Sequence, residues 1–427
     1  MITCRADFEN NERERKNTFS TEIMRIVIVD TTLQGPLIGG AQTFLPFLIK
    51  GLYAKGHEVH LVANDKPDKR IEKQITESGA IMHSRLWKRN TLVEDAAPIF
   101  ANWVNNLYPD IYLISVSADI GWVVLPYLDP AIATFTIGHS NKDAFYYPSR
   151  HYKNFLTETI GVSHEICRKY NFIAGIDKSK IHWIPYGIKP SVYLPDRMNT
   201  DVLKLIFVGR IEEVDKRISD VVAIIKKLEE KKINYQFRII GDGSRFEQIK
   251  KELVTEIYNK KVHLTGWCKG DEVLNFLQQS DIFILTSSSE GFSISLIEAM
   301  ANGCCPVVTD IPSGSVQLIK NEINGYLINV GDIDAFAIRI LYLAEHHEAL
   351  NKMRNAAWET GRNFSIDKMV DAYLDCFVKG IATLRSSPRK SDAHFPLIES
   401  CRSKYPRWLR ILKIKSKALM KSAYLQV

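Results

Sequence analysis

Short apolar runs of the β type alternate along the chain with longer stretches in which apolar residues recur every three or four positions. In the first half, strands are expected at 25–30, 58–63, 80–83, 110–116 and 132–137. Helices are expected between them at about 42–55, from residue 69, and at 94–107. An alternation of this kind predicts parallel sheets with helices packed on both faces.

The same alternation restarts after residue 203. Strands are expected at 204–208, 235–240, 261–264, 281–285 and 305–308, and helices at 218–231, 244–257, 271–279 and 293–302. Pro190 and Pro195 interrupt the periodicity between the two halves, which predicts a join there. The pattern therefore indicates an α/β protein of two Rossmann-like, doubly wound domains that face a cleft.

A length of 427 residues suits two such domains with extensions. The expected segments are a polar, disordered leader 1–23, a first domain 24–189, a linker 190–200, a second domain 201–364, a helix 365–384 and a tail 385–427. Met24 directly precedes the first strand, so the leader is expected to be dispensable.

Composition narrows the class of protein. Hydrophobic residues make up 45% of the chain and charged residues 25%, as in globular proteins. No apolar run approaches the roughly 18 residues that cross a bilayer, and no secretory signal opens the chain, which predicts a cytoplasmic protein. Its seven cysteines show no paired CxxC spacing, so neither a disulfide framework nor a zinc site is expected.

The positive charge of the protein lies in its tail. Residues 385–427 hold 11 Lys or Arg against two acids and carry +9, which leaves −2 for the rest of the chain. If 406–424 is helical, most of its basic residues share one side, opposite Trp408 and several aliphatic residues. This pattern favours an anionic membrane surface as partner, on the inner face of the cell membrane. A solvated tail or a helix packed on the body remain alternatives, and no motif supports binding to nucleic acid.

The stretch EGFSISLIE sets Glu290 and Glu298 eight positions apart across a predicted strand-to-helix turn. A helix amino terminus at the end of a parallel strand presents free N–H groups and a partial positive charge, which suit a diphosphate. Carboxylates beside it can accept hydrogen bonds from sugar hydroxyls. The segment predicts a sugar-nucleotide site, although alone it also fits an acid at a helix start followed by a solvated helix face.

Several motifs in this order and spacing make the chain resemble the retaining glycosyltransferases of family 4. They are Gly39-Gly40-Ala41, Gly209-Arg210 followed by Lys216, IIGDGS at 239–244, the Glu290 to Glu298 stretch, GCCPVV at 303–308, and NGYL at 324–327. Members of this family have the two-domain GT-B fold, with the acceptor bound by the first domain and the nucleotide sugar by the second. In that fold the last long helix crosses back to brace the first domain.

The resemblance implies a role for individual residues. Glu298 would bind the ribose hydroxyls and Glu290 the hydroxyls of the donor sugar, while Arg210 and Lys216 would stabilise the diphosphate. His139 would contact the donor sugar near the reacting carbon. The implied catalytic residues are His139, Arg210, Lys216 and Glu290, and the implied donor-binding residues are Gly39, Gly40, Arg210, Lys216, Gly291, Phe292, Ser293 and Glu298.

The implied reaction transfers a hexose from a nucleotide diphosphate sugar, a UDP- or GDP-hexose, to a glycan or lipid-linked glycan with retention of the anomeric configuration. No cofactor and no metal are implied, and cell-surface polysaccharide biosynthesis is the expected setting. The alternatives are a same-fold nucleotide-sugar epimerase or phosphorylase, or a non-catalytic sugar-nucleotide-binding partner. A nicotinamide-dependent dehydrogenase is not expected, because Gly241-Asp-Gly243-Ser-Arg-Phe246 has Phe where the fingerprint needs its third glycine.

Three positions depart from the family pattern. The chain has Tyr186-Gly187-Ile188-Lys189 where the family often has Asn-Gly-Val-Asp. Arg217 replaces the glycine that commonly follows the family lysine, and Ser293 replaces a glycine after the Gly-Phe pair. An altered contact between the domains and a slightly smaller pocket are therefore expected.

Overall fold

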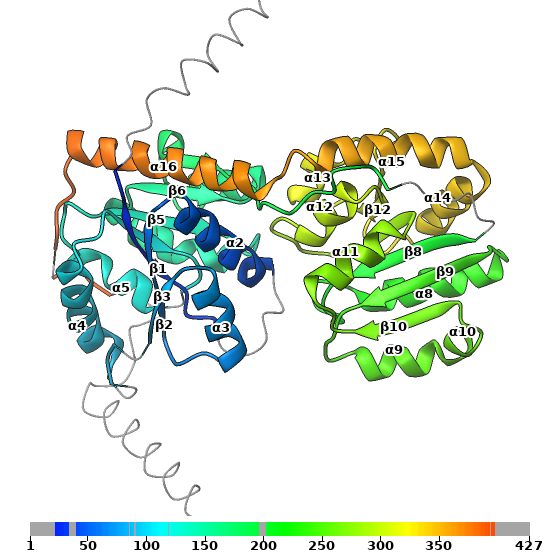
Figure 1. The fold of residues 1–427 in the computed structure, drawn as a ribbon, viewed down its shortest axis with the longest axis horizontal. Helices are drawn as coiled ribbons and strands as arrows, with labels where there is room; N and C mark the ends of the chain where they lie inside the picture. The colour runs from blue at the N-terminus through cyan, green and yellow to red at the C-terminus, as the bar shows by residue number, and fades with distance from the viewer. Residues whose placement is uncertain are drawn as a thin grey trace, which may run out of the picture.

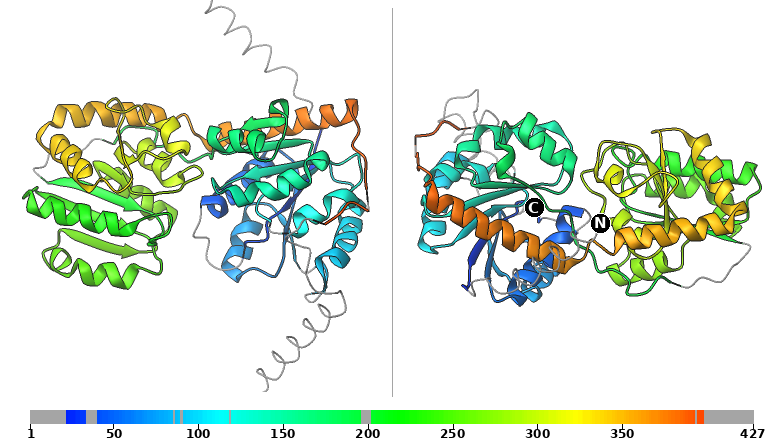
Figure 2. Two further views of the ribbon diagram at one scale, coloured as in Figure 1. Left: turned by 180° about the vertical axis from the view of Figure 1, so that it is seen from behind. Right: turned by 90° about the horizontal axis from the view of Figure 1, so that it is seen from above.

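The computed structural model describes residues 22–33, 40–84, 86–88, 91–117, 119–195, 202–392 and 394–397. Within these ranges the chain forms two α/β domains side by side (Figures 1 and 2), each built on one parallel sheet. The predicted fold class, two Rossmann-like doubly wound domains, is confirmed. Most of the proposed leader and the part of the tail from residue 398 onward, including 406–424, lie outside the described residues.

The first sheet has seven strands in the order β3-β2-β1-β4-β5-β6-β7. They are β1 (Arg25–Val29), β2 (Glu58–Ala63), β3 (Ile81–Ser84), β4 (Ile111–Ile114), β5 (Ala133–Gly138), β6 (Glu158–Gly161) and β7 (Ile181–Trp183). Its α-helices are α2 (Gly40–Ala54), α3 (Lys69–Glu77), α4 (Val93–Asn106), α5 (Ile120–Val123), α6 (Tyr147–His151) and α7 (His164–Phe172). Short 3-10 helices lie at Leu125–Tyr127, Asp143–Tyr146, Lys153–Phe155 and Lys178–Lys180.

The second sheet has six strands in the order β10-β9-β8-β11-β12-β13. They are β8 (Leu203–Val208), β9 (Tyr235–Ile240), β10 (Val262–Gly266), β11 (Ile282–Leu285), β12 (Cys305–Thr309) and β13 (Tyr326–Ile328). Its helices are α8 (Ile218–Glu230), α9 (Phe246–Glu252), α10 (Val254–Tyr258), α11 (Gly270–Gln278), α12 (Ile294–Ala301), α13 (Gly314–Leu318), α14 (Ile333–Glu345) and α15 (His347–Gly361).

The last described helix, α16 (Ile366–Ser386), follows α15 but packs on the first domain (Figure 1). A backbone bridge between Ile188 and Ser365 brings the two connecting segments together where the chain passes between the domains. The backbone of Gly187 lies against that of Ile366 so closely that a Cβ on Gly187 would meet it at 2.6 Å. These contacts fix the crossing point of the two segments between the domains.

The apolar pattern did not predict strands that are short or that begin with a polar residue. β6 begins with Glu158, which is 1% exposed and hydrogen-bonds His182 Nε2 at 2.8 Å, so a charged residue occupies a core position of the sheet. β7 and β13 have only three residues each. The helix expected at 244–257 is divided into α9 and α10 at Leu253.

Candidate active site between the two sheets

The carboxyl ends of the central strands of both sheets lie on the side where the two domains are in contact. In each sheet the strand order reverses beside the first strand, between β1 and β4 and between β8 and β11, and ligands of open α/β sheets bind at such points. His139 follows β5 in the first domain, whereas Arg210 follows β8 and Glu290 follows β11 in the second. The domains are in contact here, since a Cβ on Gly291 would lie 2.1 Å from the carbonyl oxygen of His139. Only glycine allows this approach.

Lys216 and Glu290 form an ion pair between the loops that follow β8 and β11. The Lys216 ammonium contacts Glu290 Oε1, and the side chains are 12% and 13% exposed. The Ser287 hydroxyl donates to the same carboxylate oxygen at 2.7 Å. Two residues expected to bind the donor thus lie in contact, although 74 positions separate them in the chain.

The loop that carries Lys216 is held rigidly and has an unusual backbone. Asp215 and Arg217 adopt left-handed conformations with φ of 71° and 48°, a region that favours glycine. The Thr286 hydroxyl donates to the carbonyl oxygen of Lys216 at 2.9 Å. The family's glycine at the position of Arg217 thus matches a site that needs positive φ. Arg217 tolerates it here and hydrogen-bonds Asp220 at 2.7 Å.

Arg210 follows β8, its side chain is 45% exposed, and a guanidinium nitrogen is 3.9 Å from Asp215 Oδ2. The same oxygen of Asp215 accepts a 3.0 Å bond from Lys142 of the first domain. One carboxylate therefore lies between cations of both domains. An incoming diphosphate would compete with Asp215 for these cations.

Glu298 lies in the second turn of α12, whose amino terminus is capped by the Ser293 hydroxyl. The cap bond to Leu296 N–H gives a physical reason for serine in place of the family glycine. Among the described residues no side-chain hydrogen bond or ion pair engages the Glu298 carboxylate, and burial raises its pKa to about 7. Phe292 is 4% exposed and packs on Gly314, so only its backbone is available to a ligand.

His139 is held by aromatic neighbours and by one strong hydrogen bond. Its Nδ1 lies 2.7 Å from the Tyr186 hydroxyl, and the two rings stack at 5.9 Å with an interplanar angle of 10°. Phe44 of α2 packs on both rings, 5.2 Å and 5.1 Å away. Burial lowers the pKa of His139 to about 3, so the imidazole is neutral at neutral pH.

The partners of His139 define its tautomer. Burial raises the pKa of the Tyr186 hydroxyl, which therefore stays protonated. Because Ser115 donates its own proton to Asp30, it can only accept from Nε2, which leaves Nδ1 to accept from Tyr186. Nε2 then carries the ring proton and faces Ser115 Oγ at 3.5 Å, while Ser115 donates to Asp30 at 3.0 Å. His139 thus presents a neutral N–H donor beside Ser115 in the lining of the first-domain cavity.

Replacing Tyr186 with phenylalanine should lower the free energy of unfolding by about 1–2 kcal/mol, because His139 Nδ1 would lose its donor in a buried site. Urea denaturation of both proteins measures the difference. Tyr342→Phe is the matched control, since Tyr342 stacks on His346 at 4.2 Å at the surface and its hydroxyl has no bond to that ring. An equal loss in both variants would contradict the assignment.

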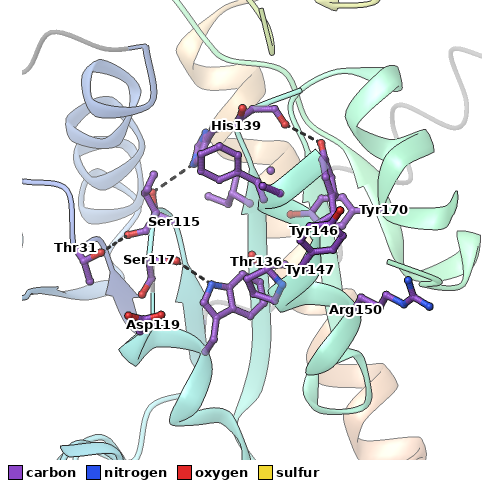
Figure 3. Close-up of a pocket in the computed structure, with 18 of the residues that line it drawn as sticks. Thr31, Ser115, Ser117, Asp119, Thr136, His139, Tyr146, Tyr147, Arg150 and Tyr170 are labelled. Atoms are coloured by element: carbon purple, nitrogen blue, oxygen red, sulfur yellow. Dashed lines mark hydrogen bonds between the residues drawn. The ribbon is translucent and has the colours of Figure 1, made fainter. Parts of the chain in front are cut away.

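A cavity of about 1250 Å³ opens beside His139 within the first domain (Figure 3). Its wall combines aromatic and polar side chains, including Trp122, Tyr146, Tyr147, Tyr170, Thr31, Ser117 and Asp119. The Trp122 indole donates to the Ser117 carbonyl at 3.0 Å, and the Tyr146 hydroxyl donates to that of Ser140 at 2.8 Å. Flat apolar faces beside hydroxyl and carboxylate groups suit a sugar ring.

The expected site residues are thus distributed as follows. Lys216 and Glu290 are in contact, and Gly291 touches the backbone of His139. Arg210 lies beside the Lys216 loop. Gly40 is the first residue of α2, whereas Gly39 lies outside the described residues.

Sequence reasoning missed four residues of the site. Asp30 and Ser115 follow β1 and β4, where strand ends alone could have drawn attention to them. Tyr186 was seen only as a departure from the family pattern, and Asp215 only as a charge between two cations. Their roles depend on contacts with residues distant in the sequence, which no local pattern contains.

Comparison with known proteins gives a consistent set of similarities. Residues 196–360 match the family model described as Glycosyl transferases group 1. The UDP-Gal:alpha-D-GlcNAc-diphosphoundecaprenol alpha-1,3-galactosyltransferase of Escherichia coli is 30% identical over 228 residues, which are 50% of this chain and 57% of that enzyme. The chain thus spans little more than half the length of this curated relative.

Solved structures resemble the whole described fold. A glycosyltransferase from Rickettsia africae superposes with a TM-score of 0.71 at 18% identity, over 84% of this chain and 99% of that one. The pneumococcal O-GlcNAc transferase GtfA, solved with UDP and GlcNAc, gives 0.70 at 14% identity over 84% and 99% of the two chains. At these identities the likeness establishes the fold alone.

Proposed function

Because the chain belongs to the glycosyl transferases group 1 family and has the GT-B fold, we propose that it is a retaining hexosyltransferase that uses a nucleotide diphosphate sugar. The observation that supports this most is the Lys216–Glu290 pair. It places a cation and a carboxylate at the strand ends of the second domain, beside the amino terminus of α12 and opposite His139.

The donor would bind mainly to the second domain. The Glu298 carboxylate is available to the ribose hydroxyls, and the amino terminus of α12 favours the diphosphate. Arg210 and Lys216 would neutralise the charge that develops on the departing diphosphate. Glu290, fixed by Lys216 and Ser287, would accept hydrogen bonds from the hydroxyls of the donor sugar.

Transfer would take place at the mouth of the first-domain cavity. The bond from the anomeric carbon to the phosphate oxygen breaks, a bond to the acceptor oxygen forms on the same face, and the departing phosphate takes the proton of the acceptor hydroxyl. His139 would hold the donor sugar through its neutral N–H. The enzyme thus supplies position and charge stabilisation.

The acceptor is proposed to be a glycan or lipid-linked glycan of cell-surface polysaccharide biosynthesis. The E. coli relative is named for a diphosphoundecaprenol-linked sugar, and a lipopolysaccharide 1,6-galactosyltransferase of E. coli K12 is 30% identical over 173 residues. The cavity has aromatic and polar walls that fit one or more sugar rings. In the part of the chain that the structure describes, no helix is long and apolar enough to cross a membrane.

The first experiment is thermal denaturation with a panel of UDP, GDP, ADP and their hexose derivatives. A ligand at 100 times its dissociation constant should add about 2.7 kcal/mol of stability. We expect one base to stabilise the protein selectively, and Arg210→Gln to weaken this effect while an exposed control, Lys231→Gln, leaves it unchanged. Stabilisation by none of them would contradict the proposal.

Product analysis with the stabilising donor separates transfer from the alternatives. Incubation with a lipid-linked acceptor should yield a longer glycan with the donor's anomeric configuration, as judged by NMR. Conversion of the donor sugar itself without an acceptor would indicate an epimerase. Release of a sugar 1-phosphate from a glycan incubated with inorganic phosphate would indicate a phosphorylase.

A further inference from the structure

The mouth of the first-domain cavity carries an unusual set of exposed side chains. Phe145 and Tyr147 line the cavity yet are 57% and 55% exposed. Arg150, which lines the same opening, and Lys153, three residues further along, are also exposed. We call Phe145, Tyr147 and Arg150, which line the cavity, together with Lys153 on the adjoining 3-10 turn, the cavity rim. Single exposed aromatic residues occur elsewhere on this protein, but here two of them lie close in sequence beside basic residues at the opening of a cavity, a combination that indicates an interaction surface.

The charges of the rim are not used within the fold. Neighbouring lysines are paired, Lys142 with Asp215 at 3.0 Å and Lys169 with Asp143 at 2.7 Å. In contrast, Arg150 and Lys153 have no ion-pair partner among the described residues. Two cations that lack a carboxylate partner, next to two exposed aromatic rings, match the headgroup region of an anionic bilayer.

A second feature brings further positive charge to the same place. After α16, the segment 387–397 runs back over the first domain and is fixed by Arg389, which is 9% exposed. Its guanidinium donates to the carbonyls of Leu125 at 2.9 Å and Asp129 at 2.8 Å. Burial of this cation is costly, so its carbonyl partners hold the segment in place.

The segment ends against the rim. Phe395 packs on His151, Tyr152 and Phe155 with ring centroids 4.8–5.7 Å apart, and His151 Nε2 donates to the Pro396 carbonyl at 2.7 Å. His151 itself lines the cavity. The last described residue, Leu397, is therefore adjacent to the cavity mouth, and the remaining 30 residues contain eight Lys or Arg against one acid.

We propose that the cavity rim docks on an anionic lipid bilayer, assisted by the basic sequence that leaves the fold beside it, and that the cavity opens toward the bilayer surface. This docking surface rests on the proposed function, because its role would be to let a lipid-held acceptor enter the cavity directly from the membrane. Binding to the bilayer itself requires no turnover, so the two can be tested separately.

The test is co-sedimentation of the full chain with vesicles of phosphatidylcholine, with or without 30% phosphatidylglycerol. The wild type should bind only the anionic vesicles, and less tightly at high salt. Arg150→Glu/Lys153→Glu should weaken binding by roughly 30-fold or more, since each basic residue near the surface contributes about fivefold. Phe145→Ser/Tyr147→Ser should weaken it by about tenfold through lost apolar burial.

Matched control substitutions are available at the amino ends of strands, opposite the carboxyl ends beside which the cavity lies. Tyr108 and Tyr258 are 80% and 86% exposed and precede β4 and β10, so Tyr108→Ser/Tyr258→Ser removes two exposed aromatic rings far from the rim. Lys231→Glu/Lys232→Glu makes the same change of charge before β9. Both controls should bind vesicles like the wild type, and nucleotide-induced thermal stabilisation should be intact in every variant.

Three outcomes would overturn the docking surface. The first is wild-type protein that does not bind anionic vesicles. The second is rim variants that bind them as tightly as the wild type, and the third is control variants whose vesicle affinity falls as much as that of the rim variants. Retention on a soluble polyanion such as heparin without vesicle binding would also reject a bilayer as the partner. If the protein binds vesicles through the rim but transfers no sugar, the proposed function fails and the docking surface stands.

Discussion

Replacing Lys216 with methionine should lower the kcat of hexose transfer by about 10²–10³-fold, the usual cost of losing one group that stabilises developing negative charge. The ammonium of Lys216 lies beside Glu290, in the loop that leads to the amino terminus of α12. Its charge would act on the diphosphate as it leaves. Initial rates with saturating donor and acceptor measure the effect, with Lys231→Met as the control for an exposed lysine.

A structural role of the pair can be separated from a catalytic one. With side chains 12% and 13% exposed, loss of Lys216 leaves the Glu290 carboxylate without its counter-charge, which typically costs about 3–5 kcal/mol of stability. Adding Glu290→Gln removes that charge, so the double variant should regain most of the stability and none of the transfer. Recovery of transfer together with stability would show that the pair only supports the fold.

The fold was predictable because its signals are local. Parallel strands buried on both faces give continuous apolar runs, as in IYLI of β4 and IFIL of β11, and the helices between them give a separate period. β6 was not predicted, because the charged residue Glu158 occupies a buried position in it. Glu158 hydrogen-bonds His182 on β7 and Thr383 on α16. That pairing becomes visible only when the chain is folded.

The candidate site was predictable in part. Glu290 and Glu298 could be named from their spacing across a strand-to-helix turn, and Lys216 from the resemblance to a known family. Their electrostatics could not be anticipated. The neutral state of His139 depends on Tyr186 and Phe44, which lie 47 positions after it and on α2, and the charge of Asp215 is shared by cations of two domains.

Replacing Glu298 with glutamine should raise stability and lower nucleotide affinity at the same time. The folded-state pKa of about 7 lies above the ordinary value of 4.5, so the folded protein holds this proton more tightly than the unfolded chain. The penalty for ionising the buried group is absent below pH 4.5, grows as pH rises toward 7, and is complete above it. At pH 8 the glutamine variant should therefore gain up to about 3 kcal/mol in urea denaturation, and at pH 4.5 nothing.

Nucleotide binding should show the opposite dependence. The ionised carboxylate is the better acceptor for ribose hydroxyls, so donor affinity should fall about tenfold per pH unit below 7 and level off above it. Glu298→Gln should abolish this dependence and bind more weakly at pH 8, whereas the exposed control Glu345→Gln should do neither. His139, with its pKa of about 3, does not titrate in this range. The measurement is calorimetric titration from pH 5.5 to 8.5 with the stabilising nucleotide sugar, whose diphosphate is esterified at both ends and has no titrating proton in this range. An affinity independent of pH would mean that Glu298 does not contact the ligand.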